Sequence, residues 1–337
     1  MRILVLGGTG WLGGAVARVA LARGHEVTCL ARGSSAVPAG VTWVHADRDA
    51  DDALEPVIRD DWDAVIDVSR TPQHVRRAAR DLAGRVGRAV FVSTASVYAD
   101  QATPGAAEES ATLPARDPGT ITTAQDYGSA KVMCEQIYRA AFGSERTHVA
   151  RLGLIGGPGD VSDRSGYWPW RFARAATSHA PVLVPEGGER LVSLIDVRDA
   201  AAWLLDRAAG AGDEPGTVDV TGVPHTMSQF LGLARAAAGH RGEVVGVEEG
   251  WLVQQGVQPW SGPRSLPLWL PDPAWAGMMT RSTARARALG LVPRPLADTV
   301  ADVLAWELER PAAHPRAAGL DDAEEQALLR AWTSERG

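Results

Sequence analysis

The 337-residue chain contains few cysteines and no long apolar run, and both features narrow what it can be. It has only two cysteines, Cys29 and Cys134, so no disulfide framework is expected and a reducing cytoplasm fits best. No stretch approaches the roughly 20 apolar residues that a membrane span needs. The apolar start "MRILVLGG" is too short for a signal peptide. We therefore expect a cytoplasmic protein with no membrane partner.

Basic residues are outnumbered by acidic ones. There are 34 Lys and Arg against 41 Asp and Glu, which gives a net charge of -7. This balance offers no electrostatic reason to bind a phosphate backbone, so nucleic acid is not an expected partner. The eight histidines have no spacing that suggests a metal site. With 45% hydrophobic and 22% charged residues, the composition is that of an ordinary globular protein.

Short apolar runs alternate with helical patterns in the first half of the chain. The runs predicted as strands are 2–6, 25–30, 41–46, 63–68, 88–93 and 147–152, and the helical stretches between them include 12–23, 72–83 and 127–142. Most of these strands are too continuously apolar to have one face in water. The alternation predicts an α/β fold, a doubly wound (Rossmann) parallel sheet with helices on both faces.

The pattern loosens after residue 155, where proline and glycine become frequent. It returns at 191–208, which reads as a short strand and a helix, and at 216–222, which reads as another strand. We therefore expect a dinucleotide-binding domain formed by 1–155 with 191–222. A smaller C-terminal substrate-binding lobe would then comprise 156–190 with 223–337.

A glycine-rich turn connects the first predicted strand to the first helix. Gly7, Gly10 and Gly13 lie there, with Trp11 and Leu12 between the last two. Such a turn lets the backbone approach a pyrophosphate without Cβ atoms in the way, and the helix N-terminus directs its free N–H groups at the anion. The strand, turn and helix together predict that these five residues bind a dinucleotide.

The end of the second strand indicates which dinucleotide is bound. NAD sites usually place an acid there, but this chain has Ala31, followed by Arg32 and Ser34. A guanidinium beside a hydroxyl suits a 2′-phosphate, so the sequence predicts NADP(H) over NAD(H), although Arg32 could equally be a solvated surface charge. Asp47 and Arg48 follow the third strand and are candidates to contact the adenine, with a simple polar turn as the alternative.

Tyr127 and Lys131 are four residues apart and share a helix face. A free tyrosine has a pKa near 10, and a close ammonium together with an oxidised nicotinamide favours its phenolate form. Such a pair is common by chance, but here a buried strand upstream, "AVFVSTASVYAD", runs into hydroxyl residues at its carboxyl end. Doubly wound sheets place their ligands at that edge.

Three motifs together resemble the extended short-chain dehydrogenase/reductases, the NAD-dependent epimerase/dehydratase group. They are the glycine pattern at 7–13, "VSTASVYA" at 92–99 and "YGSAK" at 127–131, and the resemblance covers roughly residues 1–222. It implies that Tyr127 donates and accepts the proton, that Lys131 binds the nicotinamide ribose and that Thr94 hydrogen-bonds the substrate oxygen. Ser93 and Ser96 are alternative hydroxyls. The resemblance also implies a homodimer.

The chain departs from the family pattern on the substrate side. Ala95 and Ser96 stand where related nucleotide-sugar dehydratases carry an Asp-Glu pair, which disfavours that reaction. Leu154 stands where epimerases usually carry an Asn, and Val192 where they carry an Arg, so a nucleotide-sugar substrate is in doubt. Ser96 and Leu154 remain candidate substrate contacts.

The second half of the chain is rich in tryptophan. Trp168 and Trp170 are the best candidates to line a substrate cleft, with core packing or a subunit contact as the alternative. The leading hypothesis is an NADP(H)-dependent oxidoreductase that acts on a small apolar or glycosidic metabolite, with NAD as the other possible cofactor. The alternatives are an epimerase with a tightly held cofactor and a non-catalytic nucleotide-sensing or RNA-binding relative.

Overall fold

The computed structural model describes residues 1–33, 35–212, 214–311 and 314–336, which form two compact units. Unit 1 comprises Met1–Ile155, Val197–Gly222 and Arg281–Val292, and unit 2 comprises Gly156–Asp196, Val223–Thr280 and Pro293–Gly337. These boundaries differ from the sequence-based division in two places. Residues 191–196 belong to unit 2, and residues 281–292 belong to unit 1.

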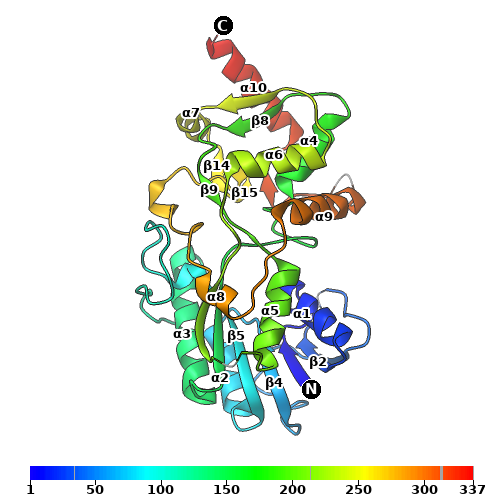
Figure 1. Cartoon of the computed structure of the whole chain (residues 1–337), viewed down its shortest axis with the longest axis vertical. Helices are drawn as coiled ribbons and strands as arrows, with labels where there is room; N and C mark the ends of the chain where they lie inside the picture. The colour runs from blue at the N-terminus through cyan, green and yellow to red at the C-terminus, as the bar shows by residue number, and fades with distance from the viewer. Residues whose placement is uncertain (34, 213, 312–313, 337) are drawn as a thin grey trace. The chain divides into compact units, whose positions relative to one another are not determined.

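Unit 1 is built on a seven-stranded parallel sheet in the order β11-β6-β5-β4-β1-β2-β3 (Figure 1). Its strands are β1 (Arg2–Leu6), β2 (Glu26–Ala31), β3 (Thr42–His45), β4 (Trp62–Asp67), β5 (Val86–Thr94), β6 (Thr147–Leu152) and β11 (Gly216–Val220). The strand order reverses between β1 and β4, as in doubly wound sheets. The predicted Rossmann fold is confirmed, and the ends of the six strands predicted before residue 155 shift by at most two residues.

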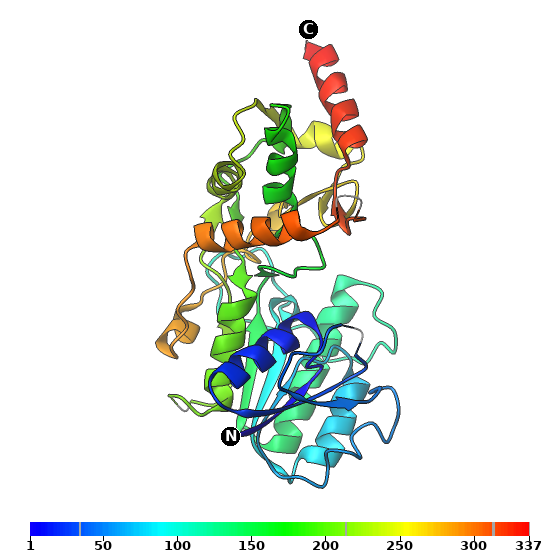
Figure 2. The same ribbon diagram turned by 90° about the vertical axis from the view of Figure 1, so that its right-hand side faces the viewer.

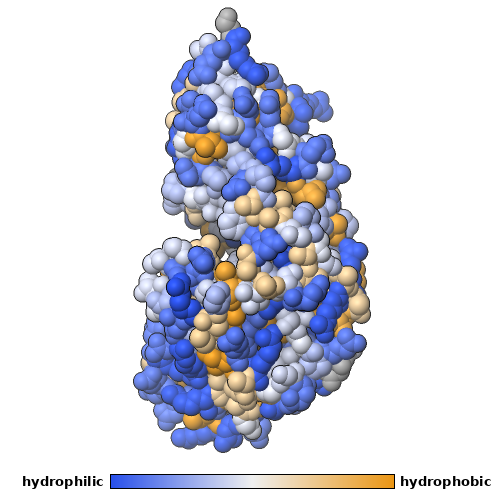
Figure 3. Space-filling model, turned by 90° about the vertical axis from the view of Figure 1, so that its left-hand side faces the viewer, coloured by the Kyte–Doolittle hydropathy of each residue, from blue (hydrophilic) through white to orange (hydrophobic). Residues whose placement is uncertain are grey.

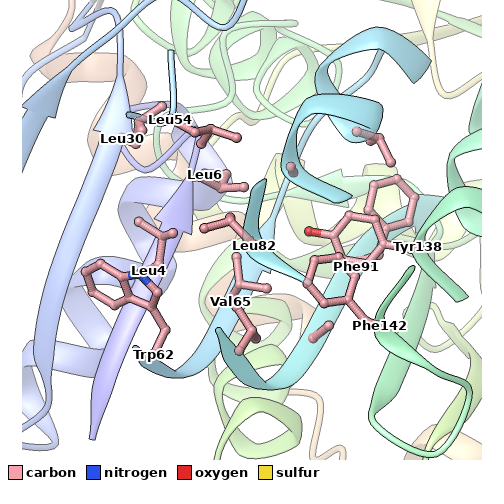
Figure 4. Close-up of a cluster of buried hydrophobic side chains, with 14 of the residues drawn as sticks. Leu4, Leu6, Leu30, Leu54, Trp62, Val65, Leu82, Phe91, Tyr138 and Phe142 are labelled. Atoms are coloured by element: carbon pink, nitrogen blue, oxygen red, sulfur yellow. The ribbon is translucent and has the colours of Figure 1, made fainter. Parts of the chain in front are cut away.

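Helices cover both faces of this sheet. One face carries α1 (Trp11–Ala22) and α5 (Val197–Ala208), and the other carries α2 (Pro72–Leu82) and α3 (Ala124–Phe142) (Figures 1 and 2). A short helix, α8 (Ala284–Ala288), lies against β11. The face under α2 and α3 is filled by buried apolar side chains. Among them, Tyr138 stacks between Phe91 and Phe142 with centroids 4.8 Å from each (Figure 4).

Unit 2 has short strands and several helices. Its helices are α4 (Tyr167–Ala176), α6 (Met227–Ala237), α7 (Glu249–Gln254), α9 (Leu296–Glu309) and α10 (Asp322–Arg336), with a 3-10 turn at Pro273–Trp275. Its strands are β8 (Val182–Pro185), β9 (Leu191–Val192), β12 (His225–Thr226), β13 (Val244–Val247), β14 (Gln258–Trp260), β15 (Gly262–Pro263), β16 (Ser265–Pro267) and β17 (Ala318–Gly319). The two-residue strands β7 (Ile155–Gly156) and β10 (Ile195–Asp196) lie where the chain passes between the units in sequence.

Apolar side chains are scattered among polar ones on the face drawn in Figure 3. Within the described residues, no helix is both long and apolar enough to cross a membrane. The same residues contain no group of three or more His, Cys, Asp or Glu side chains arranged to hold a metal ion.

Candidate active site

Glycines are required at several positions of the turn between β1 and α1 and of the first turn of α1. Gly7 has a φ of +88°, and its N–H donates to the Leu30 carbonyl at 2.9 Å. A Cβ on Gly13 would lie 2.3 Å from the Gly7 carbonyl oxygen, and one on Gly8 would lie 2.4 Å from the Cys29 Sγ. The backbone is therefore packed too closely for side chains at these positions.

Helix α1 presents an N-terminus that fits an anion. Its N-cap is Gly10, and its first turn, which includes Trp11 and Leu12, has no acidic residue. The helix is 12 residues long, so its dipole and its first N–H groups both favour a negative charge at this end. Together with the closely packed glycines, these residues fit the pyrophosphate of a dinucleotide.

The end of β2 carries no carboxylate. Ala31 is buried and Arg32 is exposed, while Ser34 lies outside the described residues. Beyond β3, Asp47 is exposed, but Arg48 is only 8% exposed. Arg48 pairs with the buried Asp67 at 2.9 Å, which holds the pKa of this carboxyl below its usual value despite burial. This placement favours a structural role for Arg48 over contact with an adenine.

Thr94 ends β5 at the carboxyl edge of the sheet. It is the N-cap of the 3-10 turn η1 (Ala95–Val97), because its Oγ1 accepts a hydrogen bond from the Ser96 N–H at 3.2 Å. The same hydroxyl donates to the Ser96 Oγ at 3.2 Å. Both side chains are half-buried, so the edge presents two adjacent hydroxyls.

Helix α3 brings Tyr127 close to this hydroxyl segment. The helix starts after Thr123, whose side chain forms a capping box with Asp126. A Cβ on Gly128 would lie 2.2 Å from the Ser96 carbonyl oxygen, so only glycine allows the first turn of α3 to pack this tightly on η1. Tyr127, the preceding residue, is half-buried. Gly128 was not predicted as a site residue, although "YGSAK" contains it.

Lys131 is held inside unit 1 with its ammonium at the ends of two strands. The side chain is 2% exposed, and Nζ donates to the carbonyls of Ser69 at 2.6 Å and Val92 at 2.5 Å. Nζ also lies 4.1 Å from the centroid of the Phe91 ring. Burial lowers the pKa of Lys131 to about 8, partly opposed by Cys134, Asp67 and Glu135.

Two further charged residues belong to this region and were missed by the sequence analysis. The exposed Arg70 has its guanidinium carbon 5.3 Å from the centroid of the Tyr127 ring. Glu135 is 1% exposed and accepts hydrogen bonds from the Ser93 Oγ at 2.6 Å and from Arg151 at 2.8 Å. Arg70 follows β4 at the carboxyl edge, and that topological cue could have identified it.

The remaining predicted substrate contacts divide between the units. Leu154 is half-buried just after β6 in unit 1. Trp168 and Trp170 lie on α4 in unit 2. Trp168 is fully buried and donates its indole N–H to the Pro267 carbonyl at 2.7 Å, which favours core packing. Trp170 is half-buried, with the Arg316 guanidinium carbon 3.9 Å from its ring centroid.

A family model identifies the class of protein that this fold and site define. The model of the "NAD dependent epimerase/dehydratase family" matches residues 3–84 and 70–220. The chain belongs to this family, so the resemblance inferred from its motifs is confirmed.

Individual proteins of known name are also similar to this chain. A 2′-dehydrokanamycin reductase from Streptomyces kanamyceticus is 32% identical over 224 residues, which cover 62% of this chain and 60% of that protein. The UDP-Glc/GlcNAc 4-epimerase of Campylobacter jejuni superposes with a TM-score of 0.67 at 16% identity, covering 92% of this chain and 99% of the other. The UDP-glucuronic acid 4-epimerase of Bacillus cereus, in complex with NAD, gives 0.63 at 13% identity, with coverages of 92% and 100%. At these identities, the solved structures establish a shared fold.

Proposed function

We propose that the protein is an NADP(H)-dependent reductase that interconverts a carbonyl and an alcohol on a small apolar or glycosidic metabolite. One observation carries this proposal: the half-buried Tyr127 and the buried ammonium of Lys131 lie on one helix that packs on the hydroxyl segment ending β5. The reductase named among the relatives supports reduction over epimerisation. So does Leu154, which replaces the Asn that epimerases of this family usually carry.

The cofactor would be held entirely by unit 1. The glycine turn with Trp11 and Leu12 would bind the pyrophosphate, and Arg32 would pair with a 2′-phosphate, because Ala31 offers no competing carboxylate. An ammonium has three donors, and Lys131 gives two of them to the Ser69 and Val92 carbonyls. The third would bind a ribose hydroxyl. When bound, the nicotinamide would supply or accept the hydride.

The residues of this chain would orient the substrate oxygen and move its proton. The Thr94 O–H, which donates to the Ser96 Oγ in the unliganded site, would turn from it to donate a hydrogen bond to that oxygen. Tyr127 would give up or take the proton at its phenol oxygen. Lys131 and Arg70 are both positive, so each would favour the phenolate form of Tyr127.

The reductase and epimerase proposals differ in their use of NADPH. The test is to follow NADPH absorbance with a panel of ketones, with 2′-dehydrokanamycin as the first probe because of the relative's name. A reductase consumes NADPH in proportion to the alcohol formed. Interconversion of two epimers with no net NADPH loss would instead identify an epimerase and reject this proposal. An RNA gel shift at physiological salt is the check on the non-catalytic alternative.

A further inference from the structure

The indole of Trp43 is hydrogen-bonded to the end of strand β2. Trp43 is the second residue of β3, where it pairs in register with Cys29 of β2. Its Nε1 donates to the Ala31 carbonyl at 3.2 Å. His45, two residues further along, packs its ring edge against the indole with centroids 5.5 Å apart. The ring is therefore fixed directly beside the residue that precedes Arg32.

The chain then turns over this ring at Gly33. Gly33 has a φ of +74°, a conformation that residues with a side chain rarely adopt. A Cβ at this position would lie 2.5 Å from Cζ2 of Trp43 and 3.1 Å from Cη2. The backbone of Gly33 thus rests on the indole, and the ring sets the path of the Arg32–Gly33 turn.

Support of the turn gives a reason for a large, partly exposed tryptophan at position 43. Trp43 is 44% exposed, although a tryptophan on a strand usually buries most of its ring. The turn at Gly33 and the His45 ring both contact the indole. Removing the ring would leave the turn without its support, while the paired strands would keep their backbone bonds.

The turn matters because it carries the residue on which the cofactor preference depends. A guanidinium recognises a phosphate through a planar fork of donors, so its recognition is sensitive to where the backbone places it. The ribose 2′-OH of NADH offers no such charge. A displaced Arg32 therefore weakens NADPH binding much more than NADH binding.

We propose that Trp43 is a specificity-determining positioning residue, which holds the Arg32–Gly33 turn where the Arg32 guanidinium meets the 2′-phosphate of NADP(H). This inference rests on the NADP(H) assignment proposed above. It adds a residue of β3, outside the Arg32–Gly33 turn, whose contact with that turn would set the position of Arg32 and so the cofactor preference.

The test compares dissociation constants for NADPH and NADH in four proteins: the wild type, Trp43→Ala, Trp43→Phe and Trp275→Ala. Trp275 is the control, because it is 38% exposed and belongs to unit 2. Trp43→Ala should weaken NADPH binding about tenfold or more, the value of a lost charge-assisted hydrogen bond, and change NADH binding less than about twofold. Trp43→Phe keeps a ring under Gly33 and should recover part of the preference. Trp275→Ala should match the wild type.

A second variant covers the case in which Trp43→Ala does not fold. Gly33→Ala forces a Cβ into the indole and should lower the NADPH preference with Trp43 still present. A wild type that prefers NADH would overturn the cofactor assignment and this inference with it. A wild-type preference for NADPH that survives in both Trp43→Ala and Gly33→Ala, or an equal loss of both nucleotides, would overturn the inference alone.

Discussion

The buried charges of helix α3 in unit 1 differ in their contacts from a buried ion pair of unit 2. In unit 1, the buried Lys131 and Glu135 lie on the helix that carries Tyr127 and contact the carboxyl end of β5. In unit 2, buried carboxylates tie together segments that are far apart in sequence: Glu325 of α10 accepts from Arg171 of α4 and from the Leu183 N–H at 2.8 Å. The buried charges of helix α3 are therefore expected to affect turnover, and the Arg171–Glu325 pair of unit 2 to affect stability.

The largest effect on turnover should come from replacing Tyr127 of helix α3, and a second tyrosine of the same helix separates turnover from stability. Tyr127→Phe should lower kcat about 10²- to 10⁴-fold, the usual contribution of a general acid, and leave the free energy of unfolding nearly unchanged. Tyr138→Phe is the matched control, because Tyr138 donates to the buried Asp67 at 3.1 Å. It should keep turnover and lose about 1 kcal/mol of stability. Turnover assays and urea unfolding of both variants check this, and an active Tyr127→Phe would contradict it.

Lys131 should produce the next largest effect and a pH dependence. Lys131→Met should lower kcat about 10²-fold, as loss of a site donor does. Because its pKa is lowered to about 8, the ammonium of the wild type is present below that pH, and the activity that depends on it should fall as pH rises through about 8. Lys131→Arg stays charged and should show no such fall. An identical descending limb in Lys131→Arg would reject the assignment.

The same lowered pKa has a consequence for stability. The unfolded lysine keeps its ordinary pKa of 10.5, so between about pH 8 and 10.5 the unfolded chain binds more protons than the folded one. The contribution of this group to the free energy of unfolding should therefore rise with pH across that window. Urea unfolding of the wild type and Lys131→Met at pH 8 and pH 10 should reveal the difference.

In unit 2, removing one partner of a buried ion pair should cost stability without changing cofactor binding. Glu325→Gln leaves the 6%-exposed Arg171 with only the carboxylate of Asp322, 3.9 Å away, and loss of one partner of a buried pair costs about 3–5 kcal/mol. Cofactor affinity per folded molecule should stay at the wild-type value, since the proposed cofactor residues all lie in unit 1. A large loss of cofactor affinity in Glu325→Gln, with an unchanged free energy of unfolding, would contradict the stabilising role of this ion pair.

The smallest effect is expected at Arg70, over the Tyr127 ring. Helix α3 also carries the charged Asp126 and Lys131, and Asp126 is paired with Arg116 at 2.9 Å, while the η1 turn (Ala95–Val97) has no charged side chain. Arg70→Gln removes one cation, so the phenolate is less favoured and the limb of the pH–rate profile that belongs to Tyr127 should move to higher pH, with kcat reduced less than about tenfold. Arg85→Gln, a half-exposed arginine paired with Asp61, is the control. An unchanged limb would exclude Arg70 from tuning the phenol.

The sequence predicted those parts of the molecule that depend on local pattern. The sheet of unit 1 and the glycine turn follow from continuous apolar strands and from backbone approaches that only glycine permits. Helix α3 was predicted from residue 127 but begins at Ala124, because the capping box at Thr123 fixes its start. The two-residue strands of unit 2 are too short for any periodicity to reveal.

Long-range contacts account for most of what the sequence did not predict. Residues 281–292 return to unit 1, where Arg281 pairs with the buried Asp219 at 3.0 Å and its guanidinium carbon lies 3.3 Å from the centroid of the Tyr98 ring. Arg48 follows a strand, as an adenine contact would, but its partner Asp67 ends another strand. Such pairings bring together residues far apart in the chain, and hydrophobic periodicity carries no information about them.

A crystal structure of the protein with NADP⁺ would test most directly the central claim, that Tyr127 and Lys131 act on a dinucleotide seated on the glycine turn of unit 1. We expect the pyrophosphate at the start of α1, a ribose hydroxyl bonded to Lys131 Nζ and the Tyr127 phenol directed at the nicotinamide. A dinucleotide bound elsewhere, or a phenol directed away from the nicotinamide, would contradict it.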